Sequence, residues 1–218
     1  MINSFFKKYE NKYKGQAAVL FGTGPSLDLY DSTQVNPDIS VGTNFIGKHR
    51  FFDQNLESYA LLDYYFFGDR NRHMDASFKV KKDKFCACEV DGRPHPLHLS
   101  QEEGEQLGAY GMSVMNSYPE FTKDISENPT HGESIIFHAL NFLFYVGVSK
   151  IYIVGCDCSG NTCFNNILGI NGAQFGYEPF LNGWRRAKAF VEEGHVETKI
   201  ISVNPVGLKG FFEEIYTC

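Results

Sequence analysis

The sequence predicts one α/β domain over residues 1–218, doubly wound around a mainly parallel sheet with helices on both faces. Short apolar runs, rich in β-branched and aromatic residues, alternate along the chain with segments of helical spacing. Several runs are apolar on both faces, which is typical of parallel strands covered by helices on both sides. Strands and helices that alternate in this way indicate a Rossmann-like fold.

Six runs carry the strand pattern, since each is short, apolar and enriched in β-branched or aromatic residues. Helical patterns or long connections lie between them, as parallel pairing requires. The candidate strands are residues 17–22, 39–43, 61–68, 84–90, 150–155 and 198–203.

The clearest helical pattern covers about residues 131–146. Thr130 and Glu133 have the spacing of a capping box, in which each side chain accepts from a backbone amide at the helix start. Gly147 supplies the signal for the end of the helix. The sequence therefore predicts a capped helix in the second half of the chain.

Two further helices are expected at about 183–194 and 207–216, because each has apolar residues at helical spacing. These apolar faces indicate packing in the core. Residues 91–130 contain several prolines and glycines and are expected to be an irregular excursion or to hold small helices.

The composition describes a soluble globular protein with a formal net charge of −6, which gives no basic footprint for nucleic acid. The N-terminus lacks the basic start and apolar core of a secretory signal, and the apolar stretch 135–148 is too short to span a bilayer. We therefore expect a cytoplasmic protein with no membrane span. Peripheral membrane association and homo-oligomerisation both stay open.

The six cysteines include two pairs with one residue between them, Cys86-Ala87-Cys88 and Cys156-Asp157-Cys158. On a strand, this spacing directs both thiols to the same face. Together with Cys163 they offer a zinc site as one alternative, although zinc ligands more often have two to four residues between them. Buried, reduced thiols without a metal are the expectation, because disulfide frameworks belong to short secreted chains.

Small and polar residues follow four of the expected strands. In a doubly wound sheet, ligands bind beyond the carboxyl ends of the strands. Glycines allow backbone amides to approach phosphates, while amide and carboxylate side chains bind a base or a ribose. The sequence therefore predicts a nucleotide site built from Gly22, Thr23, Gly24, Pro25, Ser26, Asn44, Asp69 and Asp157.

The turn after the first strand, Gly22-Thr23-Gly24-Pro25-Ser26, differs from the turn that binds NAD. The third glycine is replaced by Pro25-Ser26-Leu27, and the acidic residue expected after the second strand is replaced by Thr43-Asn44. Pro25 suits the first turn of a helix, and Ser26 adds a hydroxyl. The turn predicts binding of a nucleotide phosphate or pyrophosphate, with Gly24 closest to it because it has no Cβ.

Several segments in order resemble a known group of enzymes. GTGPSL, GTNF, HGES and VGVSKIYIVGCD are similar to the bacterial CMP-sialic acid-dependent sialyltransferases of lipooligosaccharide synthesis. They are equally similar to a related family that includes flagellin-modifying motility accessory factors and archaeal-type 6-hydroxymethylpterin diphosphokinases. The resemblance covers about residues 17–70 and 130–158, with a weaker similarity at 183–215.

The resemblance implies a role for each matching position. Gly22, Thr23, Gly24 and Ser26 would hold the nucleotide phosphates, and Asn44 would contact the nucleotide. The HGES segment would place Gly132, Glu133 and Ser134 against the cytidine or the sugar, and Asp157 at the ribose. The chain departs from the sialyltransferases at Thr23, where they have asparagine, and it lacks their tyrosine pair and their histidine base at the matching positions.

Three functions follow. The first is a sialyltransferase-like glycosyltransferase of lipopolysaccharide biosynthesis, which transfers a sugar from a nucleotide-activated donor, a CMP-sugar, to a bacterial surface glycan or protein. It needs no metal or other cofactor, and His131 is the candidate base because it precedes the Gly132-Glu133-Ser134 helix start. The second is an ATP-dependent diphosphokinase in which Asp69 and Asp157 hold Mg²⁺. The third is a nucleotide-binding module without catalytic groups.

Overall fold

The computed structural model describes residues 3–48, 62–68, 80–96, 98–115, 120–132, 134–158 and 178–217. Two of the expected site residues, Asp69 and Glu133, lie outside these ranges. The side chains of Thr130 and His131 are also outside the description, although their backbone belongs to a strand.

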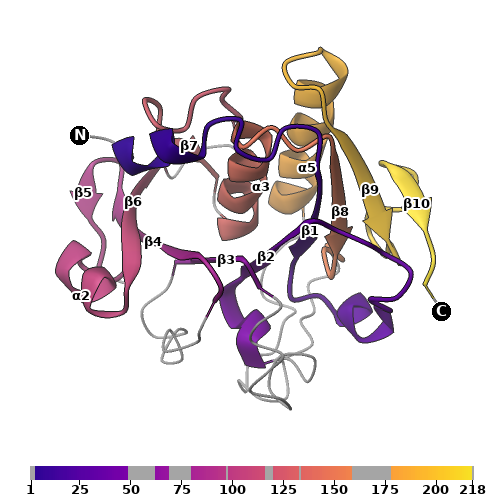
Figure 1. The fold of residues 1–218 in the computed structure, drawn as a ribbon, viewed down its shortest axis with the longest axis horizontal. Helices are drawn as coiled ribbons and strands as arrows, with labels where there is room; N and C mark the ends of the chain where they lie inside the picture. Colours follow the sequence, from indigo (N-terminus) through magenta and orange to yellow (C-terminus); the bar gives the residue numbers. More distant parts are fainter. Residues whose placement is uncertain are drawn as a thin grey trace.

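The described chain forms one ten-stranded sheet in the order β10-β9-β8-β1-β2-β3-β4-β6-β7, and all neighbours along this path are parallel (Figure 1). The short strand β5 (Arg93–Pro94) pairs antiparallel with β4. All six predicted strands are present, with small shifts at their ends. The path strands are β1 (Ala17–Phe21), β2 (Ile39–Thr43), β3 (Tyr64–Phe67), β4 (Asp83–Val90), β6 (Ala109–Met115), β7 (Thr130–His131), β8 (Lys150–Val154), β9 (Lys199–Val203) and β10 (Glu213–Ile215).

The direction of winding changes once. From β1 the chain builds the sheet outward to β7, and helix α3 (Ile135–Tyr145) then leads it to β8, on the other side of β1. From β8 it continues outward to β9 and β10. The α/β fold is therefore doubly wound, as predicted, and its topological switch point lies between β1 and β8.

Each face of the sheet has its own hydrophobic core. On one face lie the 3₁₀ helix η1 (Ser4–Tyr9), α3 and α5 (Glu178–Glu192). On the other lie the 3₁₀ helices η2 (Pro25–Leu29) and η3 (Asn44–Lys48) and the helix α2 (Gln101–Gln106). Every residue of α3 is buried, because this apolar helix packs on the inside of the curved sheet in Figure 1.

The predicted start of α3 is wrong. Thr130 and His131 pair with Val114 and Met115 of β6 and form β7, so the helix begins at Ile135. Its N-cap is Ser134, whose side chain makes no capping hydrogen bond, and the capping box does not form. Strand pairing with β6 therefore prevails over the local capping signal. The predicted end is confirmed, since Gly147 follows the C-cap with a φ of +80°.

The predicted helix at 207–216 is also wrong. Turns precede Glu213–Ile215, which form the edge strand β10 beside β9. Gly210 has a φ of +76°, and its amide donates to the carboxylate of Glu214. Leu208 is buried as the apolar spacing suggested, but turns rather than a helix bring it to the core.

Residues 91–130 contain more regular structure than the sequence predicts. They hold β5, α2, the full strand β6 and the first residue of β7. The capping box of α2 is complete, with Ser100 accepting from the amide of Glu103 and Glu103 accepting from the amide of Ser100.

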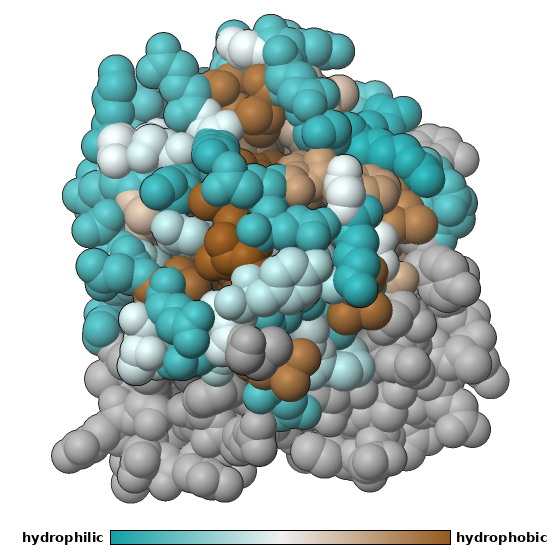
Figure 2. Space-filling view, turned by 90° about the vertical axis from the view of Figure 1, so that its right-hand side faces the viewer, coloured by the Kyte–Doolittle hydropathy of each residue, from teal (hydrophilic) through white to brown (hydrophobic). Residues whose placement is uncertain are grey.

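Both edges of the sheet are short strands, β7 with two residues and β10 with three. Figure 2 faces the β10 side, where hydrophilic residues surround patches of hydrophobic ones. Lys199 and Glu213 form an ion pair across the last two strands. Short, charged edges of this kind oppose pairing with other chains. Within the described residues, no helix has the combination of length and apolar composition that a bilayer crossing needs.

Candidate functional site

Two turns meet at the switch point, one after β1 and one after β8. The amide of Gly22 donates to Val154 O at 2.8 Å, and the amide of Gly24 donates to Gly155 O at 2.7 Å. A Cβ on Gly22 would lie 2.5 Å from Gly155 O, and a Cβ on Gly24 would lie 2.6 Å from Asp157 Cγ. The glycines therefore allow the two turns to pack directly against each other.

Asp157 and Ser26 join the two turns through a pair of hydrogen bonds. The Ser26 amide donates to Asp157 Oδ2 at 2.7 Å, and the Ser26 hydroxyl donates to Oδ1. Both residues are only 4% exposed. Burial raises the pKa of the Asp157 carboxyl above its usual range, while the two hydrogen bonds from Ser26 act in the opposite direction.

These contacts change the interpretation of the glycine turn. The sequence predicts that the missing Cβ of Gly24 leaves room for a phosphate, but Asp157 and Gly155 occupy that space. The amide and hydroxyl of Ser26 donate within the protein, and both carboxylate oxygens of Asp157 accept from Ser26. For Ser26 or Asp157 to bind a ligand through these atoms, this pair would have to open.

Pro25 and Thr23 complete the turn after β1. Pro25 occupies the first turn of a helix, as predicted, but this helix is η2, a 3₁₀ helix of five residues. Thr23 lies half-buried between the two glycines. The turn is therefore a compact reversal in place of the long helix that follows the first strand in dinucleotide-binding folds.

The end of β2 lies directly beside this turn. The Thr43 hydroxyl donates to Phe21 O at 2.9 Å, which ties β2 to the last residue of β1. Asn44 follows with a φ of +48°, a left-handed conformation that asparagine tolerates better than most residues. Its carbonyl accepts from the Tyr65 hydroxyl, and its side chain is half-buried. Gly22, Gly24, Asn44 and Asp157 thus share the carboxyl edge of three neighbouring strands, as predicted.

The structure does not bring the HGES segment to the same strands. His131 ends β7, and four strands separate β7 from β1 along the sheet. The Gly132 amide donates to Met115 O, and the Gly132 carbonyl lies 3.2 Å from Nε2 of the buried His138. Ser134 follows as the N-cap of α3. His131, Gly132 and Ser134 are therefore grouped around the ends of β6 and β7.

Sequence reasoning missed a third segment that supports the site, the turn after β9. The Gly207 amide donates to Asp157 O at 2.7 Å, and a Cβ on Gly207 would lie 2.6 Å from the same oxygen. Asn204 has a φ of +49° and donates to Leu29 O and to the Thr217 hydroxyl. Its signal was present in the sequence, because Asn204-Pro205 directly follows a predicted strand.

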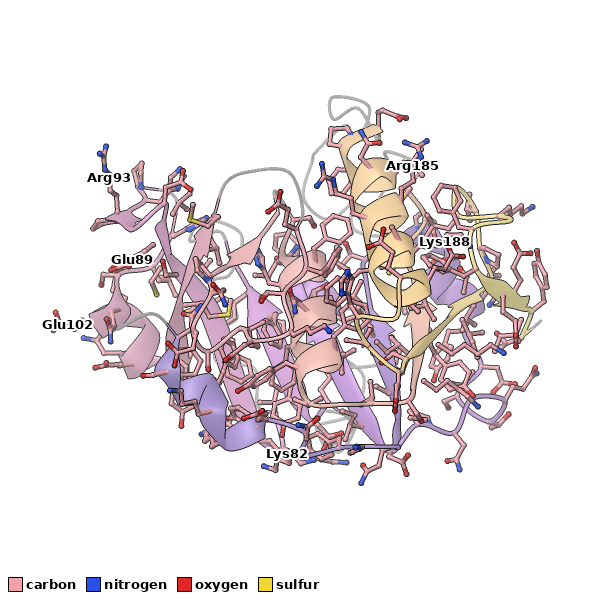
Figure 3. All side chains as sticks on the ribbon, turned by 90° about the horizontal axis from the view of Figure 1, so that it is seen from above. Lys82, Glu89, Arg93, Glu102, Arg185 and Lys188 are labelled. Atoms are coloured by element: carbon pink, nitrogen blue, oxygen red, sulfur yellow. The ribbon has the colours of Figure 1, made fainter. Side chains whose placement is uncertain are left out.

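The cationic side chains of α5 point away from the sheet and are paired with nearby acceptors. Arg185 donates to Glu178 at 2.6 Å and to Asn182 at 2.5 Å, and Arg186 lies 3.7 Å from Glu120. Figure 3 shows Arg185 and Lys188 along the outer side of this helix. Solvated surface pairs describe these arginines.

The thiols that follow β8 lie close to the site but offer little reactivity. Burial raises the pKa of Cys156 well above its usual range and that of Cys158 to about 12. Across the described ranges, no three histidine, cysteine, aspartate or glutamate side chains gather where they would hold a metal ion.

A cavity of about 410 Å³ lies at the opposite edge, where the strands begin. Both signs of charge line it, with Lys14 and Lys123 facing the same space as Glu10 and Glu197. Ligands of doubly wound sheets bind at the carboxyl edge instead. No protein-family model matches this chain, and a search of curated proteins found no match.

Proposed function

We propose that this protein is a glycosyltransferase that transfers a sugar from a nucleotide-activated donor, a CMP-sugar, to a bacterial surface glycan or protein. The observation that carries the proposal is the reversal of strand order between β1 and β8, where a glycine turn contacts a second turn. In doubly wound sheets, ligands bind at such a switch point. We therefore assign the nucleotide to the carboxyl ends of β1, β2 and β8, while the sugar and the acceptor follow from the sequence resemblance.

Within this assignment, the residues divide into two groups. Gly22, Gly24, Ser26 and Asp157 hold the two turns together through contacts within the protein. Thr23 and Asn44 are polar residues of these strand ends whose surface is only partly buried. We assign the nucleotide contacts to Thr23 and Asn44, with Asn44 binding a polar edge of the base or ribose.

The diphosphokinase alternative needs Asp69 and Asp157 as ligands of Mg²⁺. Asp157 gives it no support, because both of its oxygens accept from Ser26 and its burial disfavours a charged ligand group. His131 also gains no support as the base, since β7 is remote from β1 in the sheet order. A nucleotide-binding module without catalysis is the other alternative, and a turnover assay separates it from the transferase.

The first test measures thermal stability with CMP, CDP, UDP, GDP and ATP, each with and without Mg²⁺. A ligand at 100 times its Kd adds about 2.7 kcal/mol to the free energy of unfolding. We expect CMP and CDP to stabilise the protein without metal. A metal-dependent preference for ATP would contradict the proposal in favour of the diphosphokinase.

The second test places the nucleotide on the sheet. Asn44→Gly removes the side chain and keeps a backbone that accepts φ of +48°. Asn11→Gly is the matched control, with a φ of +53° at the opposite edge. Asn44→Gly should weaken CMP binding by about 0.5–1.5 kcal/mol, the usual contribution of one hydrogen bond, and Asn11→Gly should leave it unchanged. Equal effects of the two variants in isothermal titration would remove Asn44 from the site.

Turnover decides between the transferase and the module. The assay follows release of CMP from a CMP-sugar with a bacterial glycan acceptor, in the presence of a chelator. Acceptor-dependent release supports the transferase. Tight CMP binding without release over a broad donor and acceptor panel would leave only the nucleotide-binding module.

A further inference from the structure

Two cysteine thiols lie against each other on the face of β4 that is opposite α3. Cys86 and Cys88 are both buried, and their Sγ atoms are 3.3 Å apart. Their shared face was predicted from the spacing. The register of β4 on β6 shifts between Ala87 and Glu89, so Cys88 is an extra residue in a β-bulge.

Two glycines leave space for these sulfurs. A Cβ on Gly104 of α2 would lie 2.7 Å from Cys86 Sγ, and a Cβ on Gly111 of β6 would lie 3.0 Å from Cys88 Sγ. Any larger residue at either position would press on a sulfur atom. The helix and the neighbouring strand thus enclose the pair, which is separate from the candidate nucleotide site.

The two thiols differ in acidity. The hydrogen bond from the Cys86 thiol lowers the pKa of Cys88, and the same bond together with burial raises the pKa of Cys86. Cys88 is therefore the better nucleophile and Cys86 the proton donor. Glu89 and Glu105 place negative charge near Cys88, which opposes its ionisation and disfavours anionic reagents. Figure 3 shows Glu89 and Glu102 at this outer end of the sheet.

We infer that Cys86 and Cys88 form a redox-active dithiol that a small neutral peroxide oxidises to a reversible intramolecular disulfide. In the first step the Cys88 thiolate attacks one peroxide oxygen, the O–O bond breaks, and a sulfenic acid and hydroxide result. In the second, the Cys86 sulfur attacks Cys88, the S–S bond forms, and the sulfenic oxygen leaves as water with the thiol proton. Two thiols and one hydrogen peroxide give one disulfide and two waters, so two electrons pass to the peroxide.

The backbone geometry is compatible with this bond. Residues two apart on a strand have Cα atoms about 6.6 Å apart, from a rise of about 3.3 Å per residue. Disulfides usually join Cα atoms about 4.4–6.8 Å apart, so the strand lies near the upper limit of that range. A bond at this limit is strained and readily reduced, which makes the pair reversible.

The test treats the reduced full chain with hydrogen peroxide at neutral pH, alkylates the remaining thiols and maps the tryptic peptides by mass spectrometry. Trypsin leaves Cys86 and Cys88 in one peptide that contains no other cysteine. We expect this peptide to be unalkylated and two hydrogens lighter, and to return to the alkylated form after dithiothreitol. The peptide with Cys156 and Cys158 is the matched control and should stay alkylated. Glutathione disulfide, which is bulky and anionic, should react more slowly.

Three variants assign the roles. Cys86→Ser should leave Cys88 as a sulfenic acid that dimedone labels, and Cys88→Ser should leave Cys86 as a thiol. Gly104→Ala should slow disulfide formation, whereas Gly68→Ala, with no atom within 4 Å of the added Cβ, should not. The single-cysteine variants decide the question if Gly104→Ala does not fold. Alkylation of both cysteines after peroxide treatment, or oxidation of Cys156 and Cys158 at the same rate, would overturn the inference.

Discussion

Cys86-Ala87-Cys88 and Cys156-Asp157-Cys158 have the same cysteine spacing, but the first lies inside a strand and the second follows the end of one. In β4 the chain stays extended, so the two sulfurs meet. After β8 it turns at Cys158, which has a φ of +48°. Cys156 then donates to Val154 O, while Cys158 lies against Gly207. A spacing of two therefore predicts a shared face only as far as the strand continues.

The middle residues of the two segments also differ in what they do. Ala87 packs into the core on the opposite face of β4 from its neighbouring cysteines. Asp157 accepts two hydrogen bonds from Ser26, and its carbonyl accepts a third from Gly207. In the first segment the cysteines form the notable contact, and in the second the residue between them does.

The largest expected effect comes from making the two segments identical. Asp157→Ala gives both the sequence Cys-Ala-Cys, but it leaves the buried amide and hydroxyl of Ser26 without their acceptor. We expect a loss of about 3 kcal/mol in the free energy of unfolding, because hydrogen bonds to charged groups and buried unsatisfied donors each contribute about 1–3 kcal/mol. Urea denaturation measures it. A loss below about 1 kcal/mol would mean that Asp157 does not hold the turns together.

A smaller effect is expected at Gly24. An added Cβ would lie 2.6 Å from Asp157 Cγ and 2.7 Å from the backbone oxygen of Gly155, which has little freedom to move. Gly24→Ala should therefore cost about 1–3 kcal/mol of stability, as overpacking usually does. Gly68→Ala, at the end of β3 with no atom within 4 Å, is the control. Equal stability of the two variants would show that the turns separate easily.

The smallest effect is a dependence on pH. Burial raises the pKa of Asp157 in the folded protein above the value of about 4 for an unfolded chain. The folded state then binds this proton more tightly, so the contribution of Asp157 to stability falls as pH rises from about 4 through its folded pKa. Above that pKa the contribution is constant. Asp157→Asn cannot ionise, so the wild-type stability minus that of the variant should decrease over this window. An increase would mean that the hydrogen bonds from Ser26 outweigh burial.

The sequence predicted the central strands because their pattern is local. Runs such as Ala17–Phe21 are apolar on both faces wherever they occur in a parallel sheet. The edge elements were harder, since β7 and β10 are defined by pairing with β6 and β9 and are only two or three residues long. The helical spacing at 207–216 is also compatible with turns that bury Leu208. Local pattern alone does not distinguish these cases.

The same division applies to the candidate site. The strand-end rule predicted that Gly24, Asn44 and Asp157 share one edge of the sheet. It did not predict that Asp157 would accept from Ser26, because that contact depends on how the two turns pack. The missing Cβ of Gly24 was consistent with space for a phosphate and with space for a carboxylate, and only the packed structure distinguishes the two.

The position of β8 beside β1 also has a consequence for how the chain is made. Ser26 and Asp157 are 131 residues apart in the sequence, and β1 cannot pair on its β8 side until that length has been synthesised. At about 5–20 residues per second, the interval is on the order of ten seconds. During this time β2 can cover one side of β1, while the other side offers an unpaired edge to neighbouring chains. The switch point is thus among the last parts of the sheet to close, and a nascent chain needs protection there until its final third has left the ribosome.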